Sequence, residues 1–123
     1  MANELYTSGT MTFEDSSGAF AERFYAAQQT TISTLRYVKQ KISVGTAEEA
    51  MPLGEITSLG WFMMRNFDAT NFVNVLVGTG GAAILRCPAS SRIGPLRFST
   101  GVTAPYFIAD TAACLIEFIL TST

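Results

Sequence analysis

Residues 59–77 read LGWFMMRNFDATNFVNVLV, and this stretch indicates the fold class more directly than any other. Residues 59–67 and residues 72–77 are dense in aromatic, β-branched and other apolar side chains, a composition that favours extended strands. Between them, Asp68 and Asn71 supply side-chain acceptors and tolerate left-handed backbone, and both properties favour a turn. We therefore predict that the two runs pair as a β-hairpin.

Turn signals and strand signals alternate on the C-terminal side of this hairpin. The glycine-rich run at 78–81 has no helical pattern after it and no Lys, so it predicts a hairpin turn rather than a phosphate-binding loop. Residues 83–87 favour the next strand, which Pro88 ends, and residues 95–99 favour another. Residues 101–110, which contain a proline, are expected to form a long loop.

The stretch CLIEFIL at 114–120 is apolar on both faces of the strand that it predicts. The even-numbered positions place Cys, Ile, Phe and Leu on one face, while Leu115 and Ile119 lie on the other, interrupted by Glu117. A half-exposed strand would alternate more cleanly between apolar and polar residues. We therefore expect both faces to be covered, either by the chain's own sheets and loops or by a partner.

The N-terminal part has weaker patterns. Residues 4–15 are rich in Thr and alternate loosely, as in a strand with one covered face. Residues 19–28 have apolar side chains at helical spacing, which favours a short helix or an irregular arm, although Phe20 and Phe24 could equally flank a strand. Residues 30–44 are typical of strands, and a slip in their alternation indicates a bulge or two shorter strands.

These patterns together predict an all-β protein. A chain of 123 residues is expected to form one domain, and we count about seven or eight strands without any βαβ pattern. The predicted fold is an antiparallel β-sandwich, of which the jelly roll is one form, with an extended or partly irregular N-terminal segment. Residues 1–28 are assigned to an N-terminal arm or edge segment, and residues 29–123 to the β-sandwich domain.

The composition indicates that the surface is partly covered by other proteins. Charged residues make up 15% of the chain, against roughly 25% in an average globular protein. Thr, Ser and Gly take the place of the missing charged residues, so the exterior has fewer strongly hydrated groups. We expect a homo-oligomer, either a dimer or a trimer. The alternative is a monomer with a surface rich in hydroxyl groups.

The sequence argues against an enzyme and predicts no catalytic residue, metal site or cofactor. The chain contains no His, the commonest general base and metal ligand. The acidic pairs Glu14–Asp15 and Glu48–Glu49 are adjacent in sequence, so on a strand their side chains would point to opposite faces. No Asp-rich loop of the kind that binds Ca²⁺ occurs.

Nucleic-acid binding and membrane insertion are not expected either. The net charge is −2 and the basic residues are scattered along the sequence, whereas nucleic-acid binders gather basic residues on one face. No signal peptide is evident, and the apolar runs are shorter than the roughly 20 residues that cross a bilayer. Cys87 and Cys114 have apolar neighbours in sequence, so we expect two reduced, buried thiols.

Aromatic residues offer candidate contact sites. Trp61 lies within an apolar strand and is expected to pack in the core. Tyr106 and Phe107 follow a proline in the expected loop and are our candidates for contacts with a protein or a sugar. They could equally fold back as a lid over one end of the sandwich.

Several motifs in the second half of the chain resemble those of small structural proteins of tailed bacteriophages. They are PLGEI at 52–56, GWF at 60–62, RNFDATNFV at 65–73, APY at 104–106 and ADTAACLIEF at 109–118. The likeness covers about the last 70 residues, and the first 50 contribute nothing to it. It implies a virion-associated β-module and assigns no functional residue.

Within this resemblance, the role that best suits the physical properties is capsid decoration, or cement. Such a protein is made in the host cytoplasm and ends on the capsid surface of the virion, bound to the major capsid protein. Its N-terminal arm could add a strand to a neighbour, with Leu5, Met11 and Phe13 as anchors; alternatively, the arm is the first strand of its own sandwich. Two other roles stay open: a receptor- or glycan-binding module of a tail fibre or head appendage, and a tail-tube or adaptor ring protein.

Overall fold

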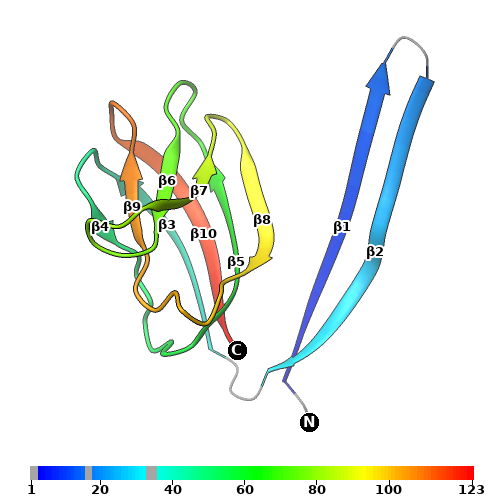
Figure 1. Cartoon of the computed structure of the whole chain (residues 1–123), viewed down its shortest axis with the longest axis horizontal. Helices are drawn as coiled ribbons and strands as arrows, with labels where there is room; N and C mark the ends of the chain where they lie inside the picture. The colour runs from blue at the N-terminus through cyan, green and yellow to red at the C-terminus, as the bar shows by residue number, and fades with distance from the viewer. Residues whose placement is uncertain (1–2, 16–17, 33–35) are drawn as a thin grey trace. The chain divides into compact units, whose positions relative to one another are not determined.

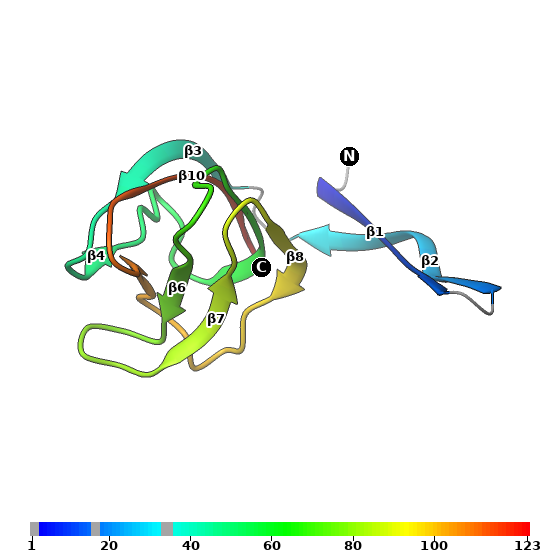
Figure 2. The same cartoon turned by 90° about the horizontal axis from the view of Figure 1, so that it is seen from above.

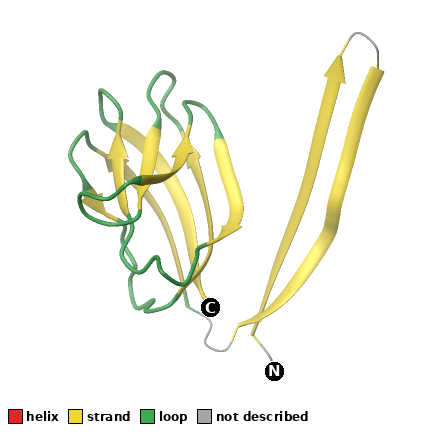
Figure 3. Ribbon diagram, in the orientation of Figure 1, coloured by secondary structure: helices red, strands yellow, loops and turns green. Residues whose placement is uncertain are grey.

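A computed structural model describes residues 3–15, 18–32 and 36–123. In these ranges the chain forms strands, loops and turns without a helix, so no helix there could cross a membrane (Figure 3). The chain divides into two compact units, residues 1–35 and residues 36–123. Each unit has its own sheet structure.

The first unit is a long β-hairpin. Strand β1 (Asn3–Asp15) pairs antiparallel with β2 (Gly18–Ile32), with irregularities in register between Thr7 and Thr10. Residues 19–28 are therefore extended, so the short helix does not form and the strand, which was the other interpretation, is the correct one. The predicted boundary at residue 28 falls inside β2. In the described residues β1 pairs only with β2, so it is not the first strand of the sandwich.

The second unit contains eight strands in two four-stranded sheets. Its strands are β3 (Tyr37–Val44), β4 (Glu49–Ala50), β5 (Leu59–Asn66), β6 (Val73–Leu76), β7 (Ala83–Cys87), β8 (Arg92–Arg97), β9 (Tyr106–Ala109) and β10 (Cys114–Ser122). One sheet has the order β3-β10-β5-β8 and the other β4-β9-β6-β7. The pairings between neighbours are antiparallel throughout.

The strand order is that of a jelly roll. The first of the eight strands pairs with the last, the second with the seventh, the third with the sixth and the fourth with the fifth. These four pairings are those of one long antiparallel hairpin that is rolled up (Figures 1 and 2). Two further pairings, β10 with β5 and β9 with β6, complete the two sheets. The predicted antiparallel β-sandwich is thus confirmed.

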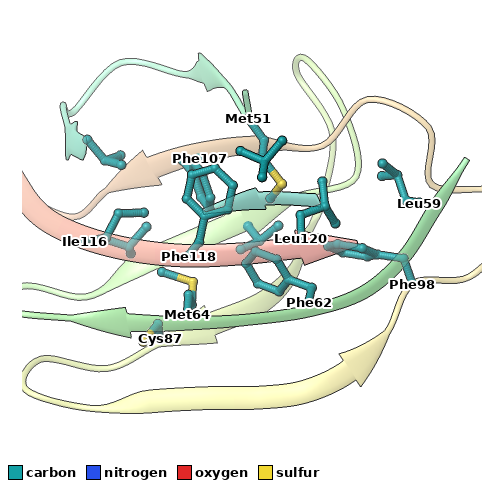
Figure 4. Packing of buried hydrophobic residues seen from close by; sticks show 14 of the residues in the cluster. Met51, Leu59, Phe62, Met64, Cys87, Phe98, Phe107, Ile116, Phe118 and Leu120 are labelled. Atoms are coloured by element: carbon teal, nitrogen blue, oxygen red, sulfur yellow. The ribbon is translucent and has the colours of Figure 1, made fainter. Parts of the chain in front are cut away.

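The two sheets enclose an aromatic core. The rings of Phe62, Phe107 and Phe118 are almost completely buried, and Phe98 packs against Phe62 with ring centroids 5.2 Å apart (Figure 4). The Phe107 and Phe118 rings meet edge to face at 5.4 Å. Such tilted pairs satisfy the electrostatic preference of aromatic rings and add to the gain from burying apolar area.

The predicted hairpin between residues 59–67 and residues 72–77 does not form. Strand β5 pairs with β10 and β8, whereas β6 lies in the other sheet and pairs with β9 and β7. Both strands have an apolar face, and each buries that face in the common core from its own sheet instead of pairing side by side. The Asp68–Asn71 segment therefore connects two sheets.

Two other loop predictions have different outcomes. The glycine-rich run at 78–81 does close a hairpin, that of β6 with β7, and the Gly81 amide donates to the Gly78 oxygen at 3.0 Å. The long loop expected at 101–110 is wrong, because residues 106–109 form β9 between β4 and β6. Cys87 and Cys114 are both buried and free, in agreement with the sequence.

Candidate protein-contact surfaces

The sheet β3-β10-β5-β8 has an outer face that is not covered within its own unit. On β10, Cys114, Ile116, Phe118 and Leu120 point into the core, and the intervening residues point outward. Leu115, on the outer face, is 43% exposed. In the single chain, only the inner face of β10 is covered, although the sequence predicted that both faces would be.

Cross-strand register arranges this outer face in rows. One row runs Lys41, Glu117, Arg65, Arg92 across the four strands. The next row places Lys39 opposite Ile119 and Ile119 opposite Met63. In a third, Trp61 lies opposite Arg97. Because facing residues in a sheet lie about 5 Å apart, each row is a set of close neighbours.

The outer face is basic. Of the seven basic residues in 36–123, it carries five, namely Lys39, Lys41, Arg65, Arg92 and Arg97, and Glu117 is the acidic residue among them. The basic residues are scattered along the sequence, but strand register gathers these five on one face. Apolar side chains lie between the cations, and among them Met63 and Phe67 are each 36% exposed.

The ring of Phe67 contacts two of the cations. The Arg65 guanidinium carbon lies 4.3 Å from the centroid of the Phe67 ring, and the Lys41 ammonium nitrogen lies 4.7 Å from it. Both distances are in the range of cation–π attraction. The Nε–H of Arg65 is buried and has no hydrogen-bond acceptor among the described residues.

Arg65 and Arg92 line two hollows. The larger has a volume of about 500 Å³ and is lined by Arg65, Asn66, Phe67, Ser90, Ser91 and Arg92. The smaller, of about 130 Å³, is lined by Met63, Met64, Arg65, Arg92, Glu117, Phe118 and Ile119. In the described ranges an ion pair joins Arg36 to Glu55, and none includes Glu117.

The two aromatic contact candidates, Tyr106 and Phe107, differ in their exposure to solvent. Phe107 is fully buried in the core, so its assignment as a surface contact is wrong; the reason is that it belongs to β9, whose alternation turns it inward. Tyr106, its neighbour, is half-buried and stays a contact candidate. Trp61 is also half-buried, on the outer face beside Arg97, whereas Phe62 occupies the core.

The three arm candidates all belong to β1. Leu5 is half-buried, whereas the side chains of Met11 and Phe13 lie outside the part of the chain that the structure describes. The β1–β2 sheet has two strands, so each strand has one edge without a pairing partner in the described residues. Unpaired edges present backbone donors and acceptors that can pair with another chain.

Sequence reasoning missed the basic row because its members come from four separate strands. The alternation of residues 61–67 does place Trp61, Met63, Arg65 and Phe67 on one face, and that signal was available. The partners on neighbouring strands depend on register, which no local pattern specifies when strands distant in sequence pair.

Comparisons with known proteins give no relative. No family model, no curated protein and no solved structure matches the chain.

Proposed function

We propose that this chain is a non-enzymatic structural protein of a bacteriophage virion, of the capsid decoration or cement type. It acts as a homo-oligomer that contacts the major capsid protein on the outside of the head. The sequence motifs at 52–73 and 104–118 suggest the virion setting, and the structure supplies surfaces suited to the role. The virion setting rests on resemblance alone, since fold by itself does not specify function.

The observation that carries the proposal is the two-stranded β1–β2 sheet. An isolated two-stranded hairpin is at best marginally stable in water, and three strands or a packed face are normally required. The strands of 13 and 15 residues each have one edge without a partner among the described residues, and pairing such an edge with another chain would stabilise the hairpin. Oligomer formation and shell binding both provide such a partner.

The exposed sheet face supports the same role. Leu115, Met63 and Phe67 expose apolar area on one face together with five cations. Protein interfaces combine apolar contacts with charged groups in this way. A cement protein requires surfaces of this kind for its contacts with neighbouring subunits.

The test compares the full chain with a variant that lacks residues 2–32, using heads from the encoding phage that have been stripped of this protein. We expect the full chain to be oligomeric by native mass spectrometry and to bind heads in a number on the order of hundreds, as a symmetric shell requires. The deletion variant should bind at least about tenfold more weakly. A cooperative thermal transition in the variant shows that the jelly roll is intact.

Other outcomes would contradict the proposal. The proposal would be overturned if the full chain were monomeric and did not bind heads. Equal binding by the deletion variant would remove the arm from the mechanism. About six or twelve copies per particle would identify a ring-forming tail or adaptor protein instead.

A glycan-binding module is the second candidate, favoured by the half-exposed Tyr106 and by the use of jelly rolls as lectins. The burial of Phe107 removes one of the two rings on which a sugar was expected to stack. Glycan-array binding that disappears in Tyr106→Ala would favour this candidate over the first.

A further inference from the structure

We propose that Arg65 and Arg92 form a clamp for a carboxylate group on an acidic protein surface that docks on the outer face of β3-β10-β5-β8. The identity of that partner as a capsid subunit rests on the proposed function. The clamp itself rests on the geometry of the sheet.

The first argument is the pairing of like charges. Arg65 on β5 lies directly opposite Arg92 on β8. Like charges in facing positions of a sheet destabilise it, so this pair of arginines favours the binding of an anion. Guanidinium groups bind carboxylates through two parallel hydrogen bonds, which makes a carboxylate well suited to the position.

The second argument is the unused donor. The Nε–H of Arg65 is buried and meets no acceptor among the described residues. A buried donor of a charged group that lacks a partner is destabilising. Because this Nε–H is shielded from solvent, we expect a docking carboxylate to meet the terminal N–H groups of the same guanidinium. Phe67 holds the guanidinium in place through its stacking contact at 4.3 Å, so little side-chain freedom remains to be lost on binding.

The third argument concerns the chain's own carboxylate. Glu117 lies opposite both Arg65 and Lys41, yet the described structure contains no ion pair that includes it. Even if Glu117 turned toward one of them, one carboxylate could not neutralise three cations in a row. The row of Lys41, Arg65 and Arg92 therefore keeps an excess of positive charge that a partner can match.

The surroundings of the clamp favour a protein over a nucleic acid. The smaller hollow brings Met63 and Ile119 next to the two arginines, so an apolar side chain beside the incoming carboxylate would be accommodated. A phosphodiester backbone has no apolar group to place in this hollow, whereas a protein surface offers apolar side chains beside its carboxylates.

The experiment follows the Arg Nε–H signals of the isotope-labelled full chain by NMR. The probes are capped hexaglutamate, capped hexaglutamine, inorganic phosphate and a six-nucleotide oligothymidylate, each titrated at low salt. We expect hexaglutamate to shift the Arg65 and Arg92 signals and to bind most tightly of the four probes. Arg65→Gln and Arg92→Gln should each weaken its binding by about tenfold or more.

Arg86→Gln is the matched control. Arg86 also stacks on an aromatic ring, that of Phe72 at 3.8 Å, but belongs to β7 in the other sheet. Its replacement should leave hexaglutamate binding unchanged. Arg92 is exposed, so Arg92→Gln retains the fold and carries the test even if Arg65→Gln does not fold.

Three results would overturn the clamp. They are undiminished hexaglutamate binding by Arg92→Gln, tighter binding of phosphate or oligothymidylate than of hexaglutamate, and no preference for hexaglutamate over hexaglutamine. Head binding separates the two proposals. If Arg92→Gln binds heads as the wild type does, the clamp is refuted as a capsid contact while the structural role stands. If the wild type does not bind heads but binds hexaglutamate at this site, the proposed structural role is refuted and the proposed clamp is supported.

Discussion

The side-chain amide of Asn66 donates a hydrogen bond to the main-chain oxygen of Asn71, 2.8 Å away, at the point where the chain leaves one sheet for the other. The same amide reaches the oxygens of Cys87 and Pro88 at 3.4 and 3.3 Å, and its own oxygen accepts from the Asp68 amide at 2.9 Å. Asn66 is 2% exposed. One buried side chain thus joins the end of β5, the crossing segment and the end of β7.

Replacement of Asn66 by Leu should destabilise the protein by about 2–3 kcal/mol, because buried main-chain groups lose their partners. Urea unfolding monitored by Trp61 fluorescence measures this change. Asn74→Ala is the control, since Asn74 accepts a hydrogen bond from the exposed Arg86 and its loss should change stability by about 0.5 kcal/mol or less. Equal effects of the two substitutions would contradict the assigned role of Asn66.

Asp68 should contribute to the acid sensitivity of the fold. The amides of Asn71 and Thr70 donate to its carboxylate at 2.6 and 3.0 Å, and these hydrogen bonds hold the pKa of Asp68 below its ordinary value of 3.8. A lowered folded-state pKa means that the contribution is complete above the unfolded-state pKa and is lost as the pH falls below about 4. We therefore expect the stability difference between the wild type and Asp68→Asn to shrink below that pH. A difference that stays constant down to pH 2 would argue against this assignment.

Phe107→Ala should destabilise the protein by about 3–5 kcal/mol, because the substitution leaves a cavity in the aromatic core. Tyr106→Ala, one position earlier on the same strand, should lower stability by about 1 kcal/mol, because its side chain is already half in solvent. Thermal unfolding of both variants measures the contrast. A larger loss of stability in Tyr106→Ala than in Phe107→Ala would mean that β9 presents its other face to the core.

Gly94 occupies a position that no other residue can adopt without strain. Its φ angle is +93°, and a Cβ atom there would lie 2.6 Å from the Phe62 oxygen. Gly94→Ala should therefore destabilise the protein by about 2–3 kcal/mol. Gly101→Ala, where a Cβ atom would meet nothing within 4 Å, should be neutral or slightly stabilising by denaturant unfolding. A neutral Gly94→Ala would indicate that the β5–β8 pairing is looser than described.

Thiol chemistry offers an independent measure of the core. Cys87 and Cys114 are fully buried, and burial raises the pKa of both thiols, so little reactive thiolate is present. We expect a thiol reagent to modify neither residue in the native state and both in denaturant, at a rate set by unfolding. Rapid modification of one thiol in the native protein would show that its end of the sandwich opens locally.

The sequence was a good guide to what each strand is and a poor guide to which strand it meets. The alternation of 114–120 and the density of 59–67 predicted strands because period-two burial is a local property. The 59–77 hairpin was wrong because turn signals at Asp68 and Asn71 do not distinguish a return in the same sheet from a crossing to the opposite one. The four residues of β9 were missed for lack of length, and the basic row could not be predicted because it depends on register between distant strands.

The pairing of β3 with β10 has a consequence for synthesis. Tyr37 lies opposite Thr121, and β10 also separates β3 from β5 as the second strand of its sheet. While β10 is still inside the ribosome, the strand that lies between β3 and β5 is missing, and the apolar faces of β3 and β5 are exposed to solvent. Contacts between residues so far apart in sequence form slowly. The sheet β3-β10-β5-β8 can therefore close only after β10 has emerged, and a stop codon before β10 would leave β3 and β5 without the strand that joins them.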